Sequence, residues 1–201
     1  MTDADNALLA RRPDLAAIAG WIEPDSRVLD LGCGDGMLLR YLWEQRRAHG
    51  YGVEIDDANV GACVKNDVNV LQMNLESGLS AFRDGSFDCV VLSQTLQAVR
   101  HTEDIMREML RVGREAIVSF PNFGHWASRL QVMAGRMPVS ENLPHEWYDT
   151  PNLHLCTIDD FEDLAQKLGL KIRERVVLHK GRPVNLLPNL LGSLAVYRCA
   201  A

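Results

Sequence analysis

The sequence lacks long apolar runs. A helix needs about 20 consecutive apolar residues to cross a bilayer, and no apolar stretch of this sequence approaches that length. The first residues, Met1 to Arg12, hold no apolar run between a basic start and a cleavage site, which a secretory signal would need. These two absences argue against a membrane partner and predict a protein of the cytoplasm.

An excess of basic residues is also missing, since the formal net charge is -6. A protein that binds the phosphate backbone of DNA or RNA presents a dense basic face. Arg11-Arg12 and Arg46-Arg47 are isolated pairs and form no such face in the sequence. We therefore expect no nucleic-acid partner.

Closely spaced cysteines are absent as well. The five cysteines are Cys33, Cys63, Cys89, Cys156 and Cys199. Their number is odd and no two stand at C-x-x-C spacing, so neither a disulfide framework nor a zinc knuckle is indicated. We expect no metal site. Cys89 and Cys199 lie in apolar runs and are interpreted as small core residues.

What remains is an ordinary globular composition, with 47% hydrophobic and 24% charged residues. The length suits one domain with a sizeable core, and no composition shift marks a boundary, so we predict a single domain over residues 1–201. Apolar periodicity predicts strands and helices in alternation along most of the chain. Strands are expected at 27–31, 50–55, 68–73, 87–92, 115–120, 170–179 and 193–199, and helices at 5–20, 35–48, 59–65, 101–112, 122–134 and 157–168.

This alternation predicts an α/β protein of three layers, Rossmann-like, with a mostly parallel sheet of seven strands. The last two strands have no helix between them, and we therefore expect an antiparallel hairpin at one edge of the sheet.

A cluster of glycines ends the first expected strand and opens the following helix. The stretch from Val28 to Gly36 reads VLDLGCGDG. Glycine is needed where the backbone turns sharply or where a ligand lies against the main chain, and the helix start supplies free N–H groups. The dinucleotide fingerprint G-x-G-x-x-G would require a third glycine at Met37, so the G-x-G-x-G spacing disfavours a nicotinamide cofactor. A tight turn without a ligand is the alternative interpretation.

The acid followed by G-x-G-x-G resembles the first motif of class I methyltransferases, which bind S-adenosylmethionine. In that family the residue matching Asp30 approaches the amino group of the ligand. Glu54 ends the second expected strand, where a carboxylate can accept hydrogen bonds from both ribose hydroxyls. The resemblance implies the class I methyltransferase fold and a site for S-adenosylmethionine or S-adenosylhomocysteine. Its cofactor-binding residues would be Asp30, Gly32, Cys33, Gly34, Gly36, Glu54, Ile55, Asn74, Leu75 and Ser93.

Two positions depart from that family. Asn74 stands where an acid usually faces the adenine amine, although an amide can still pair with adenine. Gln97 stands near the place where small-molecule methyltransferases often have a histidine, and a glutamine cannot act as a general base. The sequence also has no Asn-Pro-Pro-Tyr motif and no cysteine nucleophile. We therefore assign no catalytic residue.

A long connection, residues 135–156, follows the fifth expected strand and is too long for an ordinary loop. Its aromatic residues argue against disorder. It could be a lid over an acceptor pocket, a docking surface for another protein, or a self-packed Ω-loop. The spacing of His145 and His154 fits no recognised zinc pattern. Its polar and aromatic candidates are Arg136, His145, Trp147, Tyr148, Asp149, Asn152 and His154.

A more specific resemblance covers residues from about 12 to 200. The segments that carry it are LSQTLQ at 92–97, SFPNFGHW at 119–126, GRMP at 135–138, LP at 143–144, DTPN at 149–152, His154, and CT at 156–157. They resemble the family of the methionine biosynthesis protein MetW. The resemblance implies a role in methionine biosynthesis and a partnership with homoserine O-acyltransferase of the MetX type.

Three functions stay open on this basis. The first is a subunit that supports or regulates homoserine O-acyltransferase and senses S-adenosylmethionine, the downstream product of the pathway. The second is a small-molecule methyltransferase that works mainly by positioning its reactants. The third, a nicotinamide-dependent enzyme, is disfavoured by the glycine spacing.

Overall fold

The structure, a computed structural model, describes residues 12–201 and is built around one eight-stranded sheet. The strand order is β3-β2-β1-β4-β5-β8-β6-β7. β1 to β5 are parallel neighbours, whereas β8 runs antiparallel to both β5 and β6. The strands are β1 (Arg27–Leu31), β2 (His49–Glu54), β3 (Val70–Gln72), β4 (Phe87–Ser93), β5 (Gly113–Pro121), β6 (Lys171–His179), β7 (Arg182–Pro183) and β8 (Leu194–Ala200).

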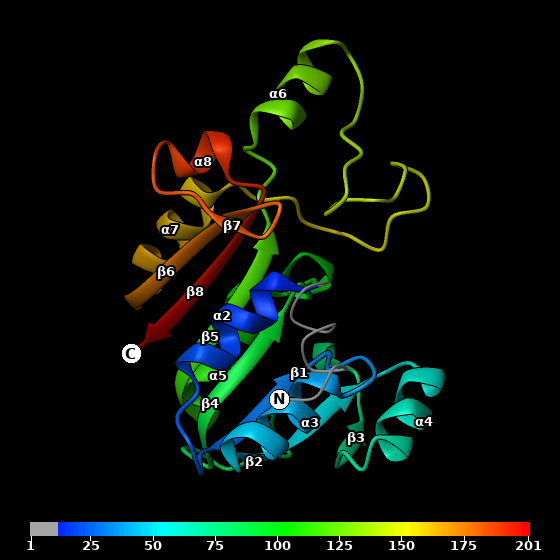
Figure 1. Ribbon diagram of the computed structural model, residues 1–201, viewed down its shortest axis with the longest axis vertical. Coiled ribbons are helices and arrows are strands. Elements are labelled where there is room, and N and C mark those ends of the chain that lie inside the picture. The colour runs from blue at the N-terminus through cyan, green and yellow to red at the C-terminus, as the bar shows by residue number, and fades with distance from the viewer. Residues whose placement is uncertain (1–11) are drawn as a thin grey trace.

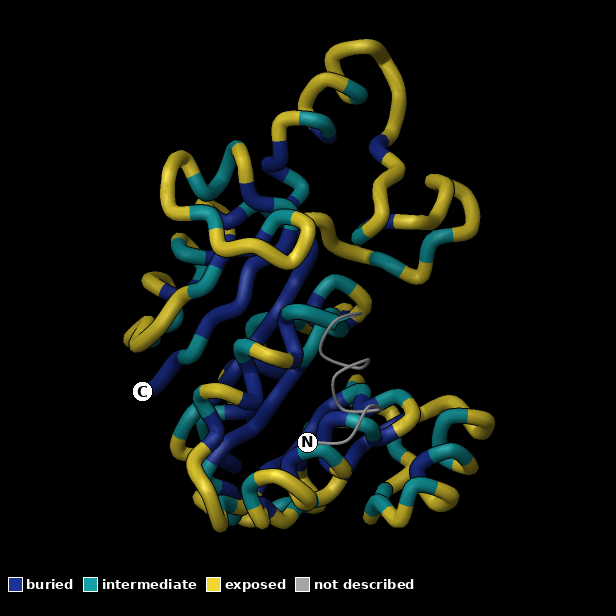
Figure 2. Tube along the Cα trace, viewed as in Figure 1, coloured by how far each residue is buried: buried dark blue, intermediate teal, exposed yellow. Residues whose placement is uncertain are grey.

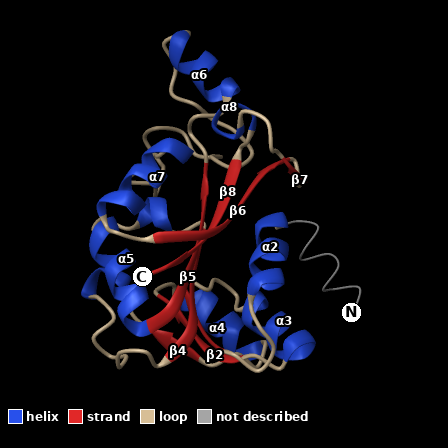
Figure 3. Ribbon diagram, turned by 90° about the vertical axis from the view of Figure 1, so that its left-hand side faces the viewer, coloured by secondary structure: helices blue, strands red, loops and turns tan. Residues whose placement is uncertain are grey.

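Helices cover both faces of this sheet and make three layers (Figures 1 and 3). α2 and α3 lie on one face, and α5 and α7 lie on the other. The helices are α2 (Pro13–Trp21), α3 (Met37–Arg46), α4 (Asp57–Lys65), α5 (Thr102–Val112), α6 (Trp126–Met133), α7 (Ile158–Lys167) and α8 (Pro188–Leu191), with short 3-10 turns η1 (Leu75–Ser77) and η2 (Leu96–Ala98). Among residues 12–201, no helix combines the length and the apolar character that crossing a membrane requires.

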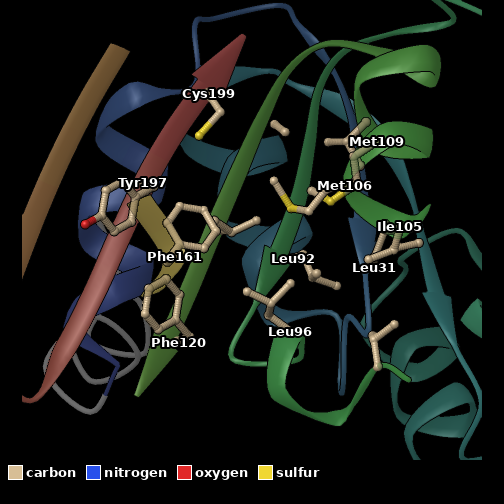
Figure 4. Close-up of a cluster of buried hydrophobic side chains, with 14 of the residues drawn as sticks. Leu31, Leu92, Leu96, Ile105, Met106, Met109, Phe120, Phe161, Tyr197 and Cys199 are labelled. Atoms are coloured by element: carbon tan, nitrogen blue, oxygen red, sulfur yellow. The ribbon is translucent and has the colours of Figure 1, made fainter. Parts of the chain in front are cut away.

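Two apolar clusters form the core, one on each face of the sheet. The first joins the sheet to α5 and α7, and Figure 4 shows part of it. There Phe120, Phe161 and Tyr197 pack with ring centroids 4.6–5.9 Å apart. The second cluster joins the sheet to α2, α3 and α4 through buried side chains such as Ile18 and Leu42. From Cys89 to Leu92, successive residues of β4 alternate between the two clusters, which is the side-chain period of a strand.

The predicted α/β fold and its antiparallel final pair are confirmed, but the predicted count of seven strands is wrong. The extra strand, β7, is a two-residue segment that pairs with β6 at the edge of the sheet. It lies in the connection rich in proline, glycine and asparagine, which also contains α8. Neither is long enough to produce a periodic pattern, so the sequence contained no signal for them.

The expected helix boundaries shift at two places for local reasons. The helix expected at 5–20 falls partly on residues 1–11, outside the described residues, and α2 begins at Pro13, whose fixed φ suits a first helical position. The helix expected at 122–134 begins later, at Trp126. Asn122 instead donates to the main-chain carbonyls of Asn189 and Gly192, at 3.0 and 2.7 Å, and ties β5 to α8.

One end of the molecule differs from the rest. α6 and the following residues, 134–156, extend beyond the carboxyl end of β5 (Figure 1) and are mostly exposed (Figure 2). Ser128 is the one buried residue of α6. This segment therefore adds little to the core of the sheet.

Candidate functional site

The glycine cluster forms a tight turn between β1 and α3. Gly32, Gly34 and Gly36 all have positive φ values, of 69°, 57° and 77°. A Cβ on Gly32 would lie 2.7 Å from Oγ1 of Thr95, whereas nothing lies within 4 Å of a Cβ on Gly34. Gly32 therefore allows a close approach to the segment after β4. Gly34 leaves open space beside the main chain, which is where a ligand could lie.

A cavity of about 350 Å³, the cofactor cavity, opens at the carboxyl ends of the parallel strands, beside this turn. Ligands of α/β proteins bind at this edge of the sheet, and the volume is within the range of small-molecule sites. Five of the predicted site residues, Gly32, Glu54, Ile55, Asn74 and Leu75, form part of the wall. The lining residues are Gly32, Val53, Glu54, Ile55, Met73, Asn74, Leu75, Glu76, Thr95, Ala98 and Val99.

Glu54 connects the glycine turn to the end of β2. Its Oε2 accepts a hydrogen bond from the main-chain N–H of Gly34 at 2.9 Å. Its Oε1 accepts from the main-chain N–H groups of Ile55 and Asp56, at 2.8 and 3.0 Å. A carboxylate has about four acceptor sites, so some capacity remains for a hydroxyl donor in the cavity. The main-chain bonds hold this carboxylate in one place before any ligand arrives.

Asp30 lies behind the turn and is 3% exposed. Its Oδ1 is buried and has no hydrogen-bond partner among the described residues. Burial raises the pKa of this carboxyl to about 7, against the attraction of Arg12 and with a further contribution from Glu54. A buried carboxylate without a partner is costly, and a ligand ammonium group is the kind of partner that would relieve the cost.

Asn74 and Leu75 lie at the far side of the cavity, where β3 ends. The Asn74 side-chain oxygen accepts from the main-chain N–H of Glu76 at 3.0 Å and caps η1. Its amide nitrogen has no hydrogen bond with any described residue, and a donor at this position can serve a ring nitrogen of a purine. The carboxylate of Glu76 then accepts from the main-chain N–H of Arg100 at 2.6 Å, so the wall continues from β3 to the segment after η2.

Five predicted cofactor residues are not among those that line this cavity: Asp30 and Gly34, described above, and Cys33, Gly36 and Ser93. Cys33 turns inward, with its Sγ 3.7 Å from Sγ of Cys63, and burial raises the pKa of both thiols. A Cβ on Gly36 would meet Cys63 and Val68, so this glycine faces the sheet side of α4. The side chain of Ser93 faces α2. The residue of this segment that lies against Gly32 is Thr95.

Ser93 belongs instead to a buried polar cluster around Asp14, the Asp14 cluster. Asp14 has a fully buried side chain whose Oδ2 accepts from Arg12 Nη2 at 2.8 Å, Ser93 Oγ at 2.9 Å and Ser119 Oγ at 3.0 Å. Gln94 Nε2 also donates to this oxygen, at 3.1 Å. Burial would raise the pKa of Asp14, but the hydrogen bonds and charge of Arg12, together with the bonds from Gln94 and Ser93, outweigh it and the pKa is lowered. Sequence reasoning missed this cluster, although an acid on the apolar face of a helix beside Leu15 and Ile18 was a usable signal.

Sequence reasoning also missed the cavity residues that follow the predicted ones along the chain. Glu76 comes two residues after Asn74, and Thr95, Ala98 and Val99 follow Ser93 through η2. The clue was their position, since segments after the carboxyl ends of parallel strands gather at one edge.

Several hydrogen bonds attach the connection 135–156 to the rest of the fold, and two attachments matter here. Asn142 Nδ2 donates to Ser193 Oγ at 3.1 Å, at the start of β8. The main-chain N–H groups of Leu153 and His154 both donate to the carbonyl of Gln97, at 2.8 and 3.0 Å. The second attachment is on η2, whose residue Ala98 lines the cofactor cavity.

The connection and the preceding helix α6 expose large apolar side chains. More than half of the exposed large apolar side chains among the described residues lie in 126–155, including Met133 at 82% and Trp147 and Tyr148 at 71%. This exposure argues against a self-packed Ω-loop. Within residues 12–201 no group of three or more His, Cys, Asp or Glu side chains is placed to hold a metal ion. The α6 face is defined by Trp126, Leu130, Val132, Met133, Met137, Val139, Trp147, Tyr148, Leu153 and Leu155.

Comparison of the sequence with known proteins identifies its relatives. Residues 12–199 match the sequence model of the family "Methionine biosynthesis protein MetW". The chain is 40% identical over 173 residues to the bifunctional methionine biosynthesis protein MetXA/MetW of Rhodopirellula baltica, covering 81% of this chain and 28% of that protein. It is 29% identical over 183 residues to the sarcosine/dimethylglycine N-methyltransferase of Halorhodospira halochloris, covering 82% of this chain and 61% of that protein. The chain thus spans less than two thirds of either relative.

Solved structures share the fold at low sequence identity. An S-adenosylmethionine-dependent methyltransferase from Mesorhizobium loti has a TM-score of 0.71 at 16% identity, with 96% of this chain and 98% of that chain covered. Magnesium protoporphyrin IX methyltransferase from Synechocystis, solved with bound S-adenosylhomocysteine, has a TM-score of 0.67 at 16% identity, with 96% and 84% covered. At this identity the likeness establishes the class I methyltransferase fold alone. The match over residues 12–199 goes further, and the chain belongs to the family of the methionine biosynthesis protein MetW.

Proposed function

We propose that the chain binds S-adenosylmethionine in the cofactor cavity and supports a homoserine O-acyltransferase of the MetX type in methionine biosynthesis, in the cytoplasm. The observation that carries the cofactor assignment is the buried, unpartnered oxygen of Asp30 behind a turn of three glycines with positive φ. The partner assignment rests on family membership and on the exposed α6 face.

The residues of the cavity, together with Asp30 and Gly34 of the adjoining turn, fit this cofactor in chemical type. Asp30 offers a carboxylate to the ammonium group of the methionine moiety. Glu54 offers its carboxylate to the ribose hydroxyls, and Asn74 offers an amide N–H to the adenine ring. Gly34 leaves room for the ligand against the main chain. When bound, S-adenosylmethionine supplies an activated methyl group, and in a sensing role it supplies only its binding free energy.

The residue types exposed on the α6 face are those expected of a protein–protein interface. Tryptophan, tyrosine, methionine and arginine are enriched in the cores of protein–protein interfaces, and large exposed apolar side chains of these kinds are typical of interaction sites. Charged residues of both signs, such as Arg136 and Glu146, lie in the same segment, as at an interface rim. The relative from R. baltica carries a MetXA part and a MetW part in one polypeptide, which supports physical association of two such units.

The two sites have a direct structural link. Leu153 and His154, at one end of the connection that carries the α6 face, donate to the carbonyl of Gln97. Gln97 belongs to η2, which borders the cofactor cavity through Ala98. A ligand that displaces η2 therefore changes the anchor of the α6 face, which is a physical route for coupling cofactor occupancy to partner affinity.

The test is the rate of homoserine acyl transfer by a MetX-type enzyme, with and without this protein, at zero and saturating S-adenosylmethionine. We expect the rate to rise when the protein is added and the rise to depend on the cofactor. A rate increase of the same size with and without the cofactor would contradict the sensing role and leave the supporting role. No rise under either condition would contradict the partnership.

A second candidate is an S-adenosylmethionine-dependent methyltransferase acting on a small molecule. It is favoured by the 29% identity to a protein named as a sarcosine/dimethylglycine N-methyltransferase. An unprotonated amine needs no general base to accept a methyl group, which suits Gln97 in the place of a histidine. Incubation with cofactor carrying a labelled methyl group would detect transfer to candidate amines, and absence of labelled product would reject this candidate for each amine tried.

A further inference from the structure

A second cavity, of about 480 Å³, lies on the opposite side of the segment that follows β4 and is here called the Arg12 cavity. It is enclosed by the start of α2, the turn after β6, the start of β8 and the connection 135–156. Its polar walls include Arg12, Gln94, Glu141, Asn142, Lys180 and Ser193. Nothing in the proposed function uses this space.

The Arg12 cavity and the cofactor cavity share one wall. Gln94 lines the Arg12 cavity, and its neighbour Thr95 lines the cofactor cavity beside Gly32. Gln94 has a positive φ of 50°, which is uncommon for a residue other than glycine and is typical of functional sites. Hydrogen bonds from its main-chain N–H to Ser119 O and Oγ, at 2.9 and 3.1 Å, hold it in that conformation.

Arg12 is held in a fixed position at the edge of this cavity. Its Nε and Nη2 donate to the two carboxylate oxygens of Asp14 at 3.0 and 2.8 Å, and Nη2 also donates to Ser93 Oγ at 2.7 Å. The Asp14 side chain is fully buried, whereas the Arg12 side chain is 39% exposed. No described residue accepts a hydrogen bond from Nη1. A guanidinium with one edge fixed and donors left over is suited to binding a carboxylate.

The cavity contains charges of both signs. Lys180 adds a second cation to that of Arg12, and Glu141 adds an anion. A ligand with two negative charges, such as a phosphate, would be repelled by Glu141 and would leave no group for it. A molecule that carries one carboxylate and one ammonium group matches all three side chains.

We propose that the Arg12 cavity binds a free α-amino acid, with its carboxylate toward Arg12 and Lys180 and its ammonium group toward Glu141. Asn142, which is bonded to Ser193 across the cavity, holds the connection 135–156 against this site. The amino acid and the cofactor would then lie on the two sides of the segment 93–97. This inference goes beyond the proposed function and stands without a partner or a cofactor.

The test is calorimetric titration of the full chain with L-homoserine and L-methionine, compared with two blocked forms of each amino acid. The methyl ester lacks the carboxylate charge and the N-acetyl form lacks the ammonium charge. We expect at least one free amino acid to bind, and each block to weaken its binding about tenfold. Absence of binding by both free amino acids, equal binding of the blocked forms, or tighter binding of inorganic phosphate would overturn the proposal.

Two variants of exposed residues assign the charges without risk to the fold. Lys180→Gln should weaken binding of the free amino acid several-fold. It should leave binding of the methyl ester unchanged, because the ester has no carboxylate charge for Lys180 to attract. Glu141→Gln should weaken binding of the free amino acid and leave binding of the N-acetyl form unchanged. Lys65→Gln, at the end of α4, is the matched control and should change nothing. Equal effects of Lys180→Gln on the free acid and its ester would contradict the assignment.

Discussion

The cofactor cavity and the α6 face carry opposite kinds of energetic cost. Beside the cofactor cavity a carboxylate, that of Asp30, is buried without a hydrogen-bond partner. On the α6 face large apolar side chains such as Met133 and Trp147 stand in solvent. The Asp30 carboxylate lacks the hydrogen bonds that water would supply, and the apolar side chains of the α6 face lack the burial that a core would supply. Each cost is relieved by a different ligand: a small cation in one region and an apolar protein surface in the other.

The largest expected effect concerns the pH dependence of stability that Asp30 imposes. Its pKa is about 7 in the folded chain, against 3.8 for an unperturbed aspartate. Between these two values the folded state binds more protons than the unfolded state, so the free energy of unfolding falls as pH rises from about 4 to 7. The loss amounts to about 4 kcal/mol at most, at 1.36 kcal/mol for each pKa unit.

Asp30→Asn removes this titration. In denaturant unfolding across pH 4.5 to 8, the wild-type stability should fall relative to that of the variant, with the difference complete above pH 7. Added S-adenosylmethionine should stabilise the wild type most at high pH, where the carboxylate is ionised, and the variant hardly at all. Parallel pH profiles for the two proteins would mean that Asp30 is not the costly group.

The second prediction tests the other half of the comparison. Met133→Glu places a charge on the most exposed apolar side chain of the α6 face. If the face binds a homoserine O-acyltransferase, burying this charge should weaken the complex about a hundredfold, the effect typical of an interface hot spot. Affinity can be measured by titrating the immobilised chain with the acyltransferase.

Val64→Glu is the matched control for this measurement. Val64 is 65% exposed on α4, away from the α6 face (Figure 1). Its substitution should leave the complex unchanged, and neither variant should alter the affinity for S-adenosylmethionine in the absence of the partner. If the two variants weaken the complex equally, the α6 face is not the interface.

The two regions also differ in how far the sequence predicts them. The glycine turn, Asp30 and Glu54 follow each other within one β-α-β segment, so local spacing was enough to place them at one edge of the sheet. The Asp14 cluster joins α2 to Ser93 and Ser119, far along the chain, and no local pattern encodes such a contact. The alternation of β4 did contain a clue, since Cys89 and Val91 face the α2 side and Ser93 continues their row. The course of 135–156 depends on a few hydrogen bonds to residues distant in the sequence, such as Gln97 and Ser193, and no apolar periodicity predicts such bonds.

The third prediction tests whether Glu54 binds ligand or only supports the turn. Glu54→Ala should weaken binding of S-adenosylmethionine tenfold or more, because each hydrogen bond to a charged acceptor contributes about 1.5–3 kcal/mol. Calorimetry measures this affinity, and thermal unfolding of the variant shows whether loss of the bond to Gly34 has also loosened the turn. Unchanged affinity would restrict Glu54 to the structural role that its three main-chain bonds already give it.

The smallest expected effect is at Asn74, where the chain departs from the acid usual in class I methyltransferases. Asn74→Asp keeps an oxygen that can cap η1 through the N–H of Glu76 and adds an acceptor for the adenine amine. The gain of one hydrogen bond, about 1 kcal/mol, is opposed by the nearby carboxylates of Glu54 and Glu76, which line the same cavity. We therefore expect a gain of no more than about threefold in affinity for S-adenosylmethionine, measured by calorimetry beside Asn74→Ala. A large gain would show that the native amide weakens the cofactor site. A loss greater than that of Asn74→Ala would show that the amide N–H, and not the side-chain oxygen, contacts the adenine.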